Sequence, residues 1–270
     1  MSIYVIADLH LSFQQNKPMD IFGNNWNNHY EKIRQDWNQK VKPEDTVILP
    51  GDFSWATYLE DTKLDFQYLN ELPGRKIMLK GNHDYWWSTL NKMNEFIKNN
   101  NFKNIEFLYN NSYLVEDIII VGTRGWILQD GEENRKMINR ENERLKLSLK
   151  NGIKTYGENK KIIAFMHYPP IQSKELIGNN YLEFYKTLKD YNIKDCYYGH
   201  LHGNSHKDAI EGDVGGINFH LISADYLDFK LLKIKWNYSE FIDKNVVESI
   251  AKLEKCDIIS KLSYSEKWVT

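Results

Sequence analysis

Side chains that can bind metals recur in this sequence where short apolar runs end. Residues 77–79 are apolar, for example, and Gly81 soon follows with Asn82, His83 and Asp84 directly behind it. Such runs are typical of buried strands, and open α/β sheets place ligand sites at the carboxyl ends of their strands. Gly81 would let the backbone turn sharply there. Five such ends carry polar side chains: Asp8, His10, Asp52, Asn82, His83, His167, His200 and His202.

The spacing within two of these groups favours convergence. Asp8 and His10 are two residues apart after the run 4–7, and alternate side chains of an extended segment point the same way. His200 and His202 repeat this spacing between two glycines. Carboxylate, amide and imidazole donors without thiolates suit Mn, Fe or Zn, and one carboxylate can hold two ions. The pattern therefore predicts a site for two divalent metal ions.

These residues, in this order, resemble the calcineurin-like metallophosphoesterases, whose five blocks run D-x-H, G-D, G-N-H-[DE], H and G-H-x-H. All five blocks are present, and they span residues 8–202. The resemblance implies an α/β (α+β) fold in which two packed mixed β-sheets are flanked by helices. It also implies hydrolysis of a phosphate ester by a hydroxide that bridges two metal ions.

The resemblance assigns the metal ligands residue by residue. The first metal would be held by Asp8, His10, Asp52 and His202. The second would be held by Asp52, Asn82, His167 and His200. Asp52 would be the bridge, which agrees with its two carboxylate oxygens, whereas a neutral imidazole has one free nitrogen to offer.

The resemblance gives His83 a role at the leaving group, as general acid or in stabilising the transition state. Asp84 would then hold its imidazolium in the charged, oriented form. An alternative is that His83 supports the metal ligands and has a modest effect on rate. Arg124, which follows a predicted strand, could contact a substrate phosphate through two hydrogen bonds, although a loop arginine is more often solvated.

The second block narrows the activity. Protein phosphatases of this class look like G-D-x-V-D-R-G there, whereas Gly51-Asp52 is followed here by Phe53-Ser54-Trp55. We therefore expect a phosphohydrolase that acts on a phosphodiester or phosphomonoester of a small molecule. One alternative is a phosphodiesterase specific for nucleotides or cyclic nucleotides. The other is a non-catalytic metal-binding scaffold for a protein partner.

The composition argues against several other classes of protein. The net charge of −2 over 270 residues gives no dedicated nucleic-acid surface. No apolar run approaches the roughly 18 residues that a membrane-spanning helix needs, and the start reads as a strand rather than a signal peptide. With two cysteines, Cys196 and Cys256, a reduced cytoplasmic protein is expected. The oligomeric state stays open.

Short apolar runs predict strands, and apolar residues at helical spacing predict helices. Together these elements would position the polar residues within a single domain of residues 1–270. Strands are expected at 4–7, 46–49, 76–79, 162–166 and 196–198, and two or three more between 217 and 235. Helices are expected at 30–41, 60–72, 132–150, 180–191 and 245–262, and another follows Trp87 and runs through Phe96. Short strands at 105–107, 113–115 and 118–121 suggest antiparallel hairpins, and the charges of 132–150 suggest a solvated helix face.

Aromatic residues close to the five blocks have two possible roles. Trp55, Trp86, Trp87 and Trp126 could form a wall for a base or a lipid chain, although ordinary packing is expected for at least two of them. His29 is expected to be a surface or helix-start histidine. Residues 11–28 are expected to form a loop that is long enough to be functional or mobile.

Overall fold

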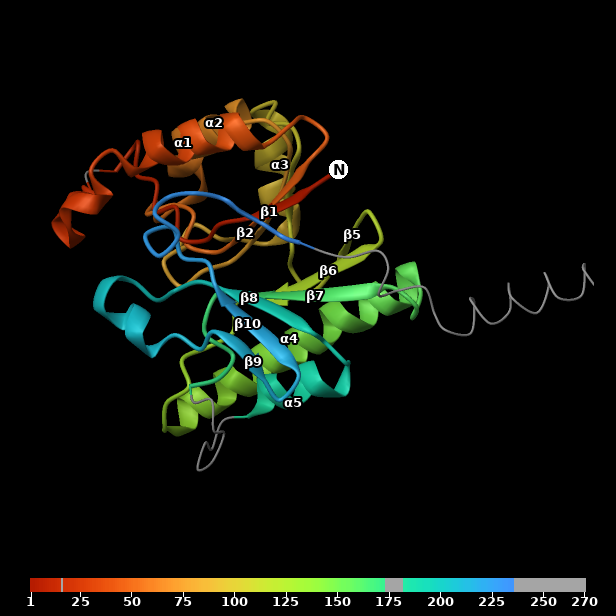
Figure 1. The fold of residues 1–270 in the computed structure, drawn as a ribbon. Coiled ribbons are helices and arrows are strands. Elements are labelled where there is room, and N and C mark those ends of the chain that lie inside the picture. Colours follow the sequence, from red (N-terminus) through yellow and green to blue (C-terminus); the bar gives the residue numbers. More distant parts are fainter. Residues whose placement is uncertain (16, 173–181, 236–270) are drawn as a thin grey trace, which may run out of the picture. The chain divides into compact units, whose positions relative to one another are not determined.

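Two mixed β-sheets face each other in the computed structural model, which describes residues 1–15, 17–172 and 182–235 (Figure 1). Within these residues the first sheet has the strand order β11-β1-β2-β3-β4 and the second β5-β6-β7-β8-β10-β9. The first comprises β1 Ile3–Val5, β2 Thr46–Pro50, β3 Arg75–Leu79, β4 Ile105–Phe107 and β11 Leu232–Lys233. The second comprises β5 Tyr113–Val115, β6 Ile118–Thr123, β7 Lys161–Met166, β8 Asp195–Tyr198, β9 Gly212–Val214 and β10 Ile217–Leu221.

Parallel pairing brings the motif segments to one edge of each sheet. β1, β2, β3 and β4 are mutually parallel, as are β6, β7, β8 and β10. In the register between β2 and β3, Pro50 lies opposite Leu79, so the segments that begin at Gly51 and Lys80 leave the sheet side by side. β1, β2 and β6 are buried along their whole length, which explains why their sequences are almost continuously apolar.

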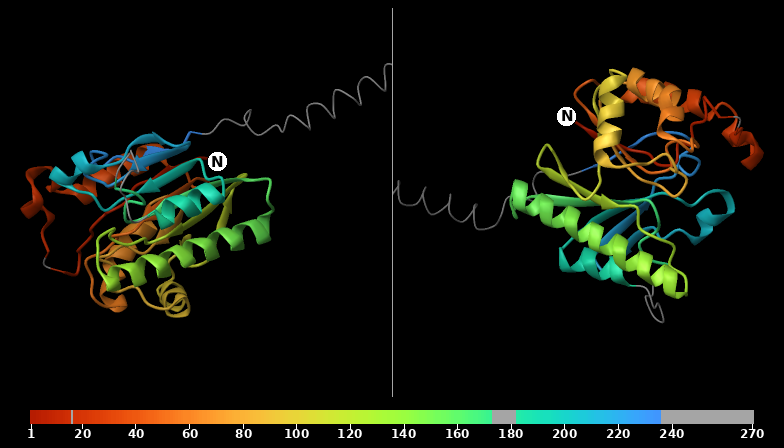
Figure 2. Two further views of the ribbon diagram at one scale, coloured as in Figure 1. Left: turned by 90° about the horizontal axis from the view of Figure 1, so that it is seen from below. Right: turned by 180° about the vertical axis from the view of Figure 1, so that it is seen from behind.

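Helices cover the outer face of each sheet (Figures 1 and 2). The first sheet shares a core with α1 His29–Lys40, α2 Lys63–Glu71 and α3 Leu90–Asn99. The second shares one with α4 Glu132–Tyr156 and α5 Glu183–Asp190. Short 3₁₀ helices are η1 Met19–Phe22, η2 Asn24–Trp26, η3 Leu59–Thr62 and η4 Gly203–Asp208. The predicted α/β architecture of two mixed sheets flanked by helices is confirmed.

Several elements differ from the expected ones. The strand at 105–107 was expected in a hairpin, but it is β4 and pairs in parallel with β3 in the first sheet, whereas β5 and β6 do form an antiparallel hairpin. β4 pairs with β3, a strand that precedes it by some 25 residues in the chain, and no local sequence pattern encodes such a distant partner. β9 was not expected. The helix predicted at 245–262 lies outside the described residues.

The sequence suggested that the charged residues of α4 form a solvated face, but one of them is buried. Glu141 is 1% exposed, and Asn142 and Ser148 are also buried, among apolar residues such as Leu145. Helical periodicity places these polar residues on the side that packs against β6. This side of the helix therefore carries a buried charge close to the end of β6.

Candidate metal centre

The motif side chains meet where the strand ends of the two sheets face each other. Asp8 and His10 follow β1, Asp52 follows β2, and Asn82 follows β3. From the second sheet, His167 follows β7, and His200 and His202 follow β8. The sheets are joined directly at this point, because the His200 amide donates to Asp8 Oδ2 over 2.9 Å. Residues far apart in the chain thus form one buried cluster.

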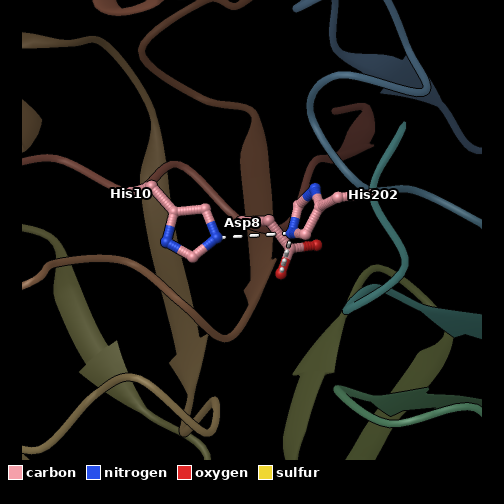
Figure 3. Close-up of side chains that lie close together, drawn as sticks. All are labelled: Asp8, His10 and His202. Carbon is pink, nitrogen blue, oxygen red and sulfur yellow. Dashed lines mark hydrogen bonds and ion pairs between the residues drawn. The ribbon is translucent and has the colours of Figure 1, made fainter. Parts of the chain in front are cut away.

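The first group of possible ligands contains Asp8, His10 and His202 (Figure 3). One ligand atom from each lies within 4.8 Å of the other two. The Nε2 atoms of His10 and His202 are 3.3 Å apart, and Asp8 Oδ1 lies 3.6 Å from His202 Nε2. Asp8 Oδ1 is buried and has no hydrogen-bond partner among the described residues. A cation between these atoms would satisfy all three.

The second group contains Asn82, His167 and His200. Asn82 Oδ1 lies 2.6 Å from His167 Nε2 and 2.8 Å from His200 Nδ1. His167 Nδ1 faces the carbonyl oxygen of Pro50 over 3.1 Å, which leaves Nε2 directed at the amide oxygen. An amide oxygen between two imidazole nitrogens is a suitable donor set for a divalent ion.

Asp52 lies between the two groups. Its Oδ2 atom is 3.7 Å from His10 Nε2 in the first group and 3.5 Å from His167 Nε2 in the second. Its other oxygen accepts a hydrogen bond from the His83 amide over 2.8 Å. The carboxylate is therefore fixed on one side and faces both groups on the other, as a bridging ligand would.

The backbone is strained at this cluster. Asp8, His10, Asp52 and His200 have φ angles of 61°, 46°, 52° and 75°, in the left-handed region that non-glycine residues adopt rarely. Each such residue costs of order 1–3 kcal/mol, and such strain gathers at functional sites. The surrounding hydrogen bonds hold these four side chains in place against that cost.

Electrostatics prepare the histidines as ligands. Burial lowers the pKa of His167 to about 3 and that of His200 to about 4, and it holds the pKa of His10 well below its usual value. These rings are therefore neutral, which is the form that binds metals. Burial also opposes charge on His202, but the carboxylates of Asp8 and Asp225 outweigh it and raise its pKa to about 10.

Asp52 responds to the same crowding of charge. Burial, and then the nearby carboxylates of Asp8 and Asp84, raise its pKa well above the usual range. Without a cation the cluster therefore retains protons on Asp52 and His202. A divalent ion would displace them, so the donor atoms, their burial and the unpaired Oδ1 of Asp8 fit the metals that the sequence implies.

Asp225 belongs to this site, although the sequence analysis missed it. Its Oδ1 atom lies 2.7 Å from His202 Nδ1, and its Oδ2 atom accepts from the Gly203 amide over 3.0 Å. Metal-binding histidines usually donate their second ring N–H to such a carboxylate, which fixes the ring. The available signal was its position, since Asp225 follows the end of β10 just as the ligands follow other strands.

His83 lies at the rim of the cluster. Its ring is half-buried, 5.8 Å from the His10 ring and 4.3 Å from the Trp55 ring, measured between centroids. Burial lowers its pKa. Its Nδ1 atom is buried and has no hydrogen-bond partner among the described residues. His83 thus stands beside the possible ligands without being one of them.

The sequence analysis expected Asp84 to orient His83, but the carboxylate of Asp84 binds other groups. Its carboxylate accepts hydrogen bonds from the amides of Gly81, Asp52, Phe53 and Ser54 and from Trp86 Nε1, over 2.8–3.2 Å. The backbone folds so that four amides converge on Asp84, and its oxygens are used there. Asp84 therefore ties the loop after β2 to the loop after β3.

Gly81 has a different purpose from the expected sharp turn. Its φ angle is not in the left-handed region. A Cβ atom at this position would instead collide with the backbone nitrogen and Oδ1 of Asp52. Glycine is required because the two loops approach so closely.

Arg124 lies next to the second group. Its carbonyl oxygen accepts from the amides of His167 and Tyr168 over 3.2 and 2.9 Å. Its guanidinium lies 4.5 Å from the centre of the Trp126 ring and 3.6 Å from Glu141 Oε1. The backbone of Arg124 therefore adjoins His167, while Glu141 of α4 and Trp126 hold its side chain.

The tryptophans divide between the site and the core. The Trp55 ring stacks on His10 with a centroid distance of 4.8 Å, and Trp26, in η2, lies 5.9 Å from the same ring. Trp86 and Trp87 pack in the core of the first sheet, as expected for two of the four. The rings that border the site are thus Trp55 and Trp26.

His29 was expected at the surface or at the start of a helix. It is the first residue of α1, but its side chain is buried. Its ring nitrogens lie 3.2 Å from the Trp26 carbonyl oxygen and 3.0 Å from that of Leu9. The ring thus connects α1 to η2 and to the segment that carries Asp8 and His10.

Comparison with known proteins places this site in a family. The family model described as calcineurin-like phosphoesterase matches residues 1–204. No curated protein matches the sequence significantly. Among the described residues no helix is long and apolar enough to cross a membrane.

Solved structures share the fold. The phosphopantetheinyl hydrolase of Mycobacterium tuberculosis is 14% identical, with a TM-score of 0.51 over 88% of this chain and 96% of its own. The protein TT1561 of Thermus thermophilus is 15% identical, with a TM-score of 0.54 over 87% of this chain and 99% of its own. The family match extends over most of the sequence and includes all five motif blocks, and so the chain belongs to the calcineurin-like phosphoesterases.

Proposed function

We propose that this protein is a two-metal phosphohydrolase that cleaves a phosphodiester or phosphomonoester of a small molecule. The observation that carries the proposal is the position of Asp52, whose Oδ2 atom lies within 3.7 Å of a histidine from each ligand group. The first metal would be held by Asp8, His10, Asp52 and His202, and the second by Asp52, Asn82, His167 and His200. Mn, Fe or Zn suits these donors.

Each group of residues has a distinct task in this proposal. The bound ions would supply Lewis acidity, which lowers the pKa of water and offsets charge on the phosphoryl oxygens. Asp52 holds the two ligand groups at a fixed separation. His83 would move a proton onto the leaving oxygen as an imidazolium. Burial lowers its pKa, and the negative charge that develops on the leaving oxygen would favour the charged ring. Asp84 keeps the loops of Asp52 and His83 in register.

A metal add-back assay tests the proposal. The full chain, stripped with chelator, should hydrolyse bis(p-nitrophenyl) phosphate or p-nitrophenyl phosphate after addition of Mn²⁺, Zn²⁺ or Fe²⁺, and not before. A panel of nucleotides, cyclic nucleotides and phospholipid head groups would then define the substrate. Tight metal binding without turnover of any phosphate ester would contradict the proposal and favour a scaffold.

The role of His83 predicts a dependence on the leaving group. His83→Asn should lower kcat by about 10²–10⁴-fold for an alkyl phosphate ester, because a poor leaving group needs the proton. The loss should be much smaller for a nitrophenyl ester, whose leaving group departs without protonation. His220→Asn is the control, since His220 stacks on Tyr197 instead. Equal losses on both esters would leave His83 a supporting role.

A further inference from the structure

Three arginines surround the buried carboxylate of Glu141, and a lysine lines the cavity next to it. Oε1 of Glu141 lies 2.9 Å from Arg144 Nη1 and 3.6 Å from an Nη2 atom of both Arg124 and Arg140. Lys80 lines the same small cavity as Arg124, Arg144 and Glu141. We refer to Lys80, Arg124, Arg140 and Arg144 as the cationic cluster.

Glu141 cannot neutralise this cluster. One negative charge faces four positive ones, and three guanidinium groups share a single carboxylate oxygen. The other oxygen accepts a hydrogen bond from Thr123 Oγ1 over 2.8 Å. A single structural ion pair would need one arginine rather than three. Glu141 instead holds the guanidinium groups close together, so that these side chains are preorganised before any ligand binds.

The cluster retains unused hydrogen-bond donors. A guanidinium has five N–H donors, and the Nε atom of Arg124 is buried without a hydrogen-bond partner among the described residues. The cavity lined by Lys80, Arg124 and Arg144 has a volume of about 20 Å³. That is room for one oxygen-sized group. Uncompensated buried donors and excess positive charge are costly unless an anion supplies the acceptors.

The cluster adjoins the second ligand group. The Arg124 carbonyl accepts from the amide of His167, and Lys80 precedes Asn82 by two residues. The Tyr168 ring, whose amide also donates to Arg124, lies 4.2 Å from the ring of His200. The cluster therefore adjoins the loop of His167 and Tyr168, and an anion held there would lie on the side of the second ligand group.

We infer that the cationic cluster is an anion subsite, and that the physiological phosphate ester carries a second anionic group a few bonds from the one that is cleaved. This inference rests on the proposed function. Planar guanidinium groups bind phosphate and carboxylate oxygens in pairs, so either anion has the required chemistry. The substrate class is thus a phosphate ester with an additional phosphate or carboxylate.

Matched esters test the subsite kinetically. The substrates are p-nitrophenyl ethyl phosphate and its analogues that end in a phosphonate or a carboxylate, since all three release the same nitrophenolate. The wild type should have a kcat/KM at least about tenfold higher for an anionic analogue, as expected for charged hydrogen bonds. In Arg144→Gln and Arg140→Gln this preference should fall by about tenfold. Preference for one of the two analogues would identify the second anion.

Lys136→Gln is the control for these variants. Lys136 lies on the same helix, one turn before Arg140, but pairs with Glu132 over 2.6 Å and is largely exposed. It should keep the preference of the wild type. Arg140 has a side chain that is 51% exposed, so its substitution tests the subsite even where Arg144→Gln fails to fold.

A binding measurement separates this inference from the proposed function. Tripolyphosphate, titrated calorimetrically into the metal-free full chain, should bind the wild type and bind Arg144→Gln about tenfold more weakly, with affinity that falls as salt rises. If no ester is hydrolysed but this difference appears, the proposed function fails and the subsite stands. Equal substrate preference and equal tripolyphosphate affinity in all variants would overturn the subsite.

Discussion

Asp225 fixes how His202 is presented to the other ligands. It lies 2.7 Å from Nδ1 of the ring, while Nε2 faces Asp8 Oδ1 and His10 on the opposite side. A neutral imidazole can bind a metal through one nitrogen when the other donates its proton to a carboxylate. A residue outside the five motif blocks thus decides which nitrogen of a motif residue is free.

We predict that Asp225→Asn weakens metal binding by about 10–100-fold, because the His202 ring loses its negatively charged partner. Competition with a chromophoric chelator measures the affinity. Asp228→Asn is the matched control, since Asp228 lies three residues further on and pairs with Lys230 at the surface. An affinity like that of the wild type in Asp225→Asn would show that backbone packing alone positions the ring.

Gly81→Ala should disrupt the same centre by steric means. The added Cβ would collide with Asp52, whose backbone carries a φ angle of 52° and has little freedom to shift. We expect a loss of metal affinity of at least about tenfold together with a destabilisation of about 1–3 kcal/mol, as for other overpacked sites. Chelator competition and urea unfolding measure the two effects. Unchanged metal affinity would mean that the loops separate without cost.

The loops that carry the ligands are held by neighbouring helices. Asp65, in α2, is fully buried and accepts hydrogen bonds from the Phe13 amide over 2.9 Å and from Ser54 Oγ. Phe13 follows the block of Asp8 and His10, and Ser54 follows Asp52. A residue of α2 therefore holds both segments that carry possible ligands through hydrogen bonds.

Asp65 also predicts a pH dependence of stability. Burial raises its pKa from 3.8 to about 6, so the folded state binds a proton that the unfolded state releases between these values. The contribution of Asp65 to stability should therefore fall as pH rises from about 4 to 6. Asp65→Asn removes this penalty, so its stability relative to the wild type should improve by about 1–3 kcal/mol between pH 4 and pH 8.

Urea unfolding at several pH values measures that difference, and Glu60→Gln, on the exposed surface of η3, is the control. A relative stability of Asp65→Asn that stays constant from pH 4 to pH 8 would contradict the prediction.

At the scale of the whole molecule, the candidate metal centre lies where the two sheets meet. Asp8, His10, Asp52 and Asn82 follow strands of the first sheet, and the other possible ligands follow strands of the second. The separate cores of the sheets each pack against their own helices. An ion bound across this junction stabilises the native state alone, because the unfolded chain does not assemble the donors.

Removal of the metals should therefore lower the Tm. At a free metal concentration of about 100 times Kd, binding adds about 2.7 kcal/mol, which corresponds to roughly 5–10 °C for a chain of this size. Scanning calorimetry with and without added Mn²⁺ or Zn²⁺ measures the shift. His10→Ala should lose most of it. A Tm that does not respond to metal would show that no ion binds the native state preferentially, which would contradict the proposed metal site.

The sequence by itself predicted the candidate donors. Eight polar side chains stood out because they follow apolar runs, and strand ends are encoded locally by composition and glycine. The resemblance to the family then selected seven of them as expected metal ligands and implied the mixed two-sheet fold: Asp8, His10, Asp52, Asn82, His167, His200 and His202.

Only the tertiary structure decided the partners. It showed that Asp84 binds backbone amides, that Asp225 holds His202, that Glu141 is buried among arginines and that β4 joins the first sheet. These contacts join residues that are distant in sequence or depend on how loops fold. They are fixed by strand register and by the need to satisfy buried polar atoms, which no local pattern of residues expresses.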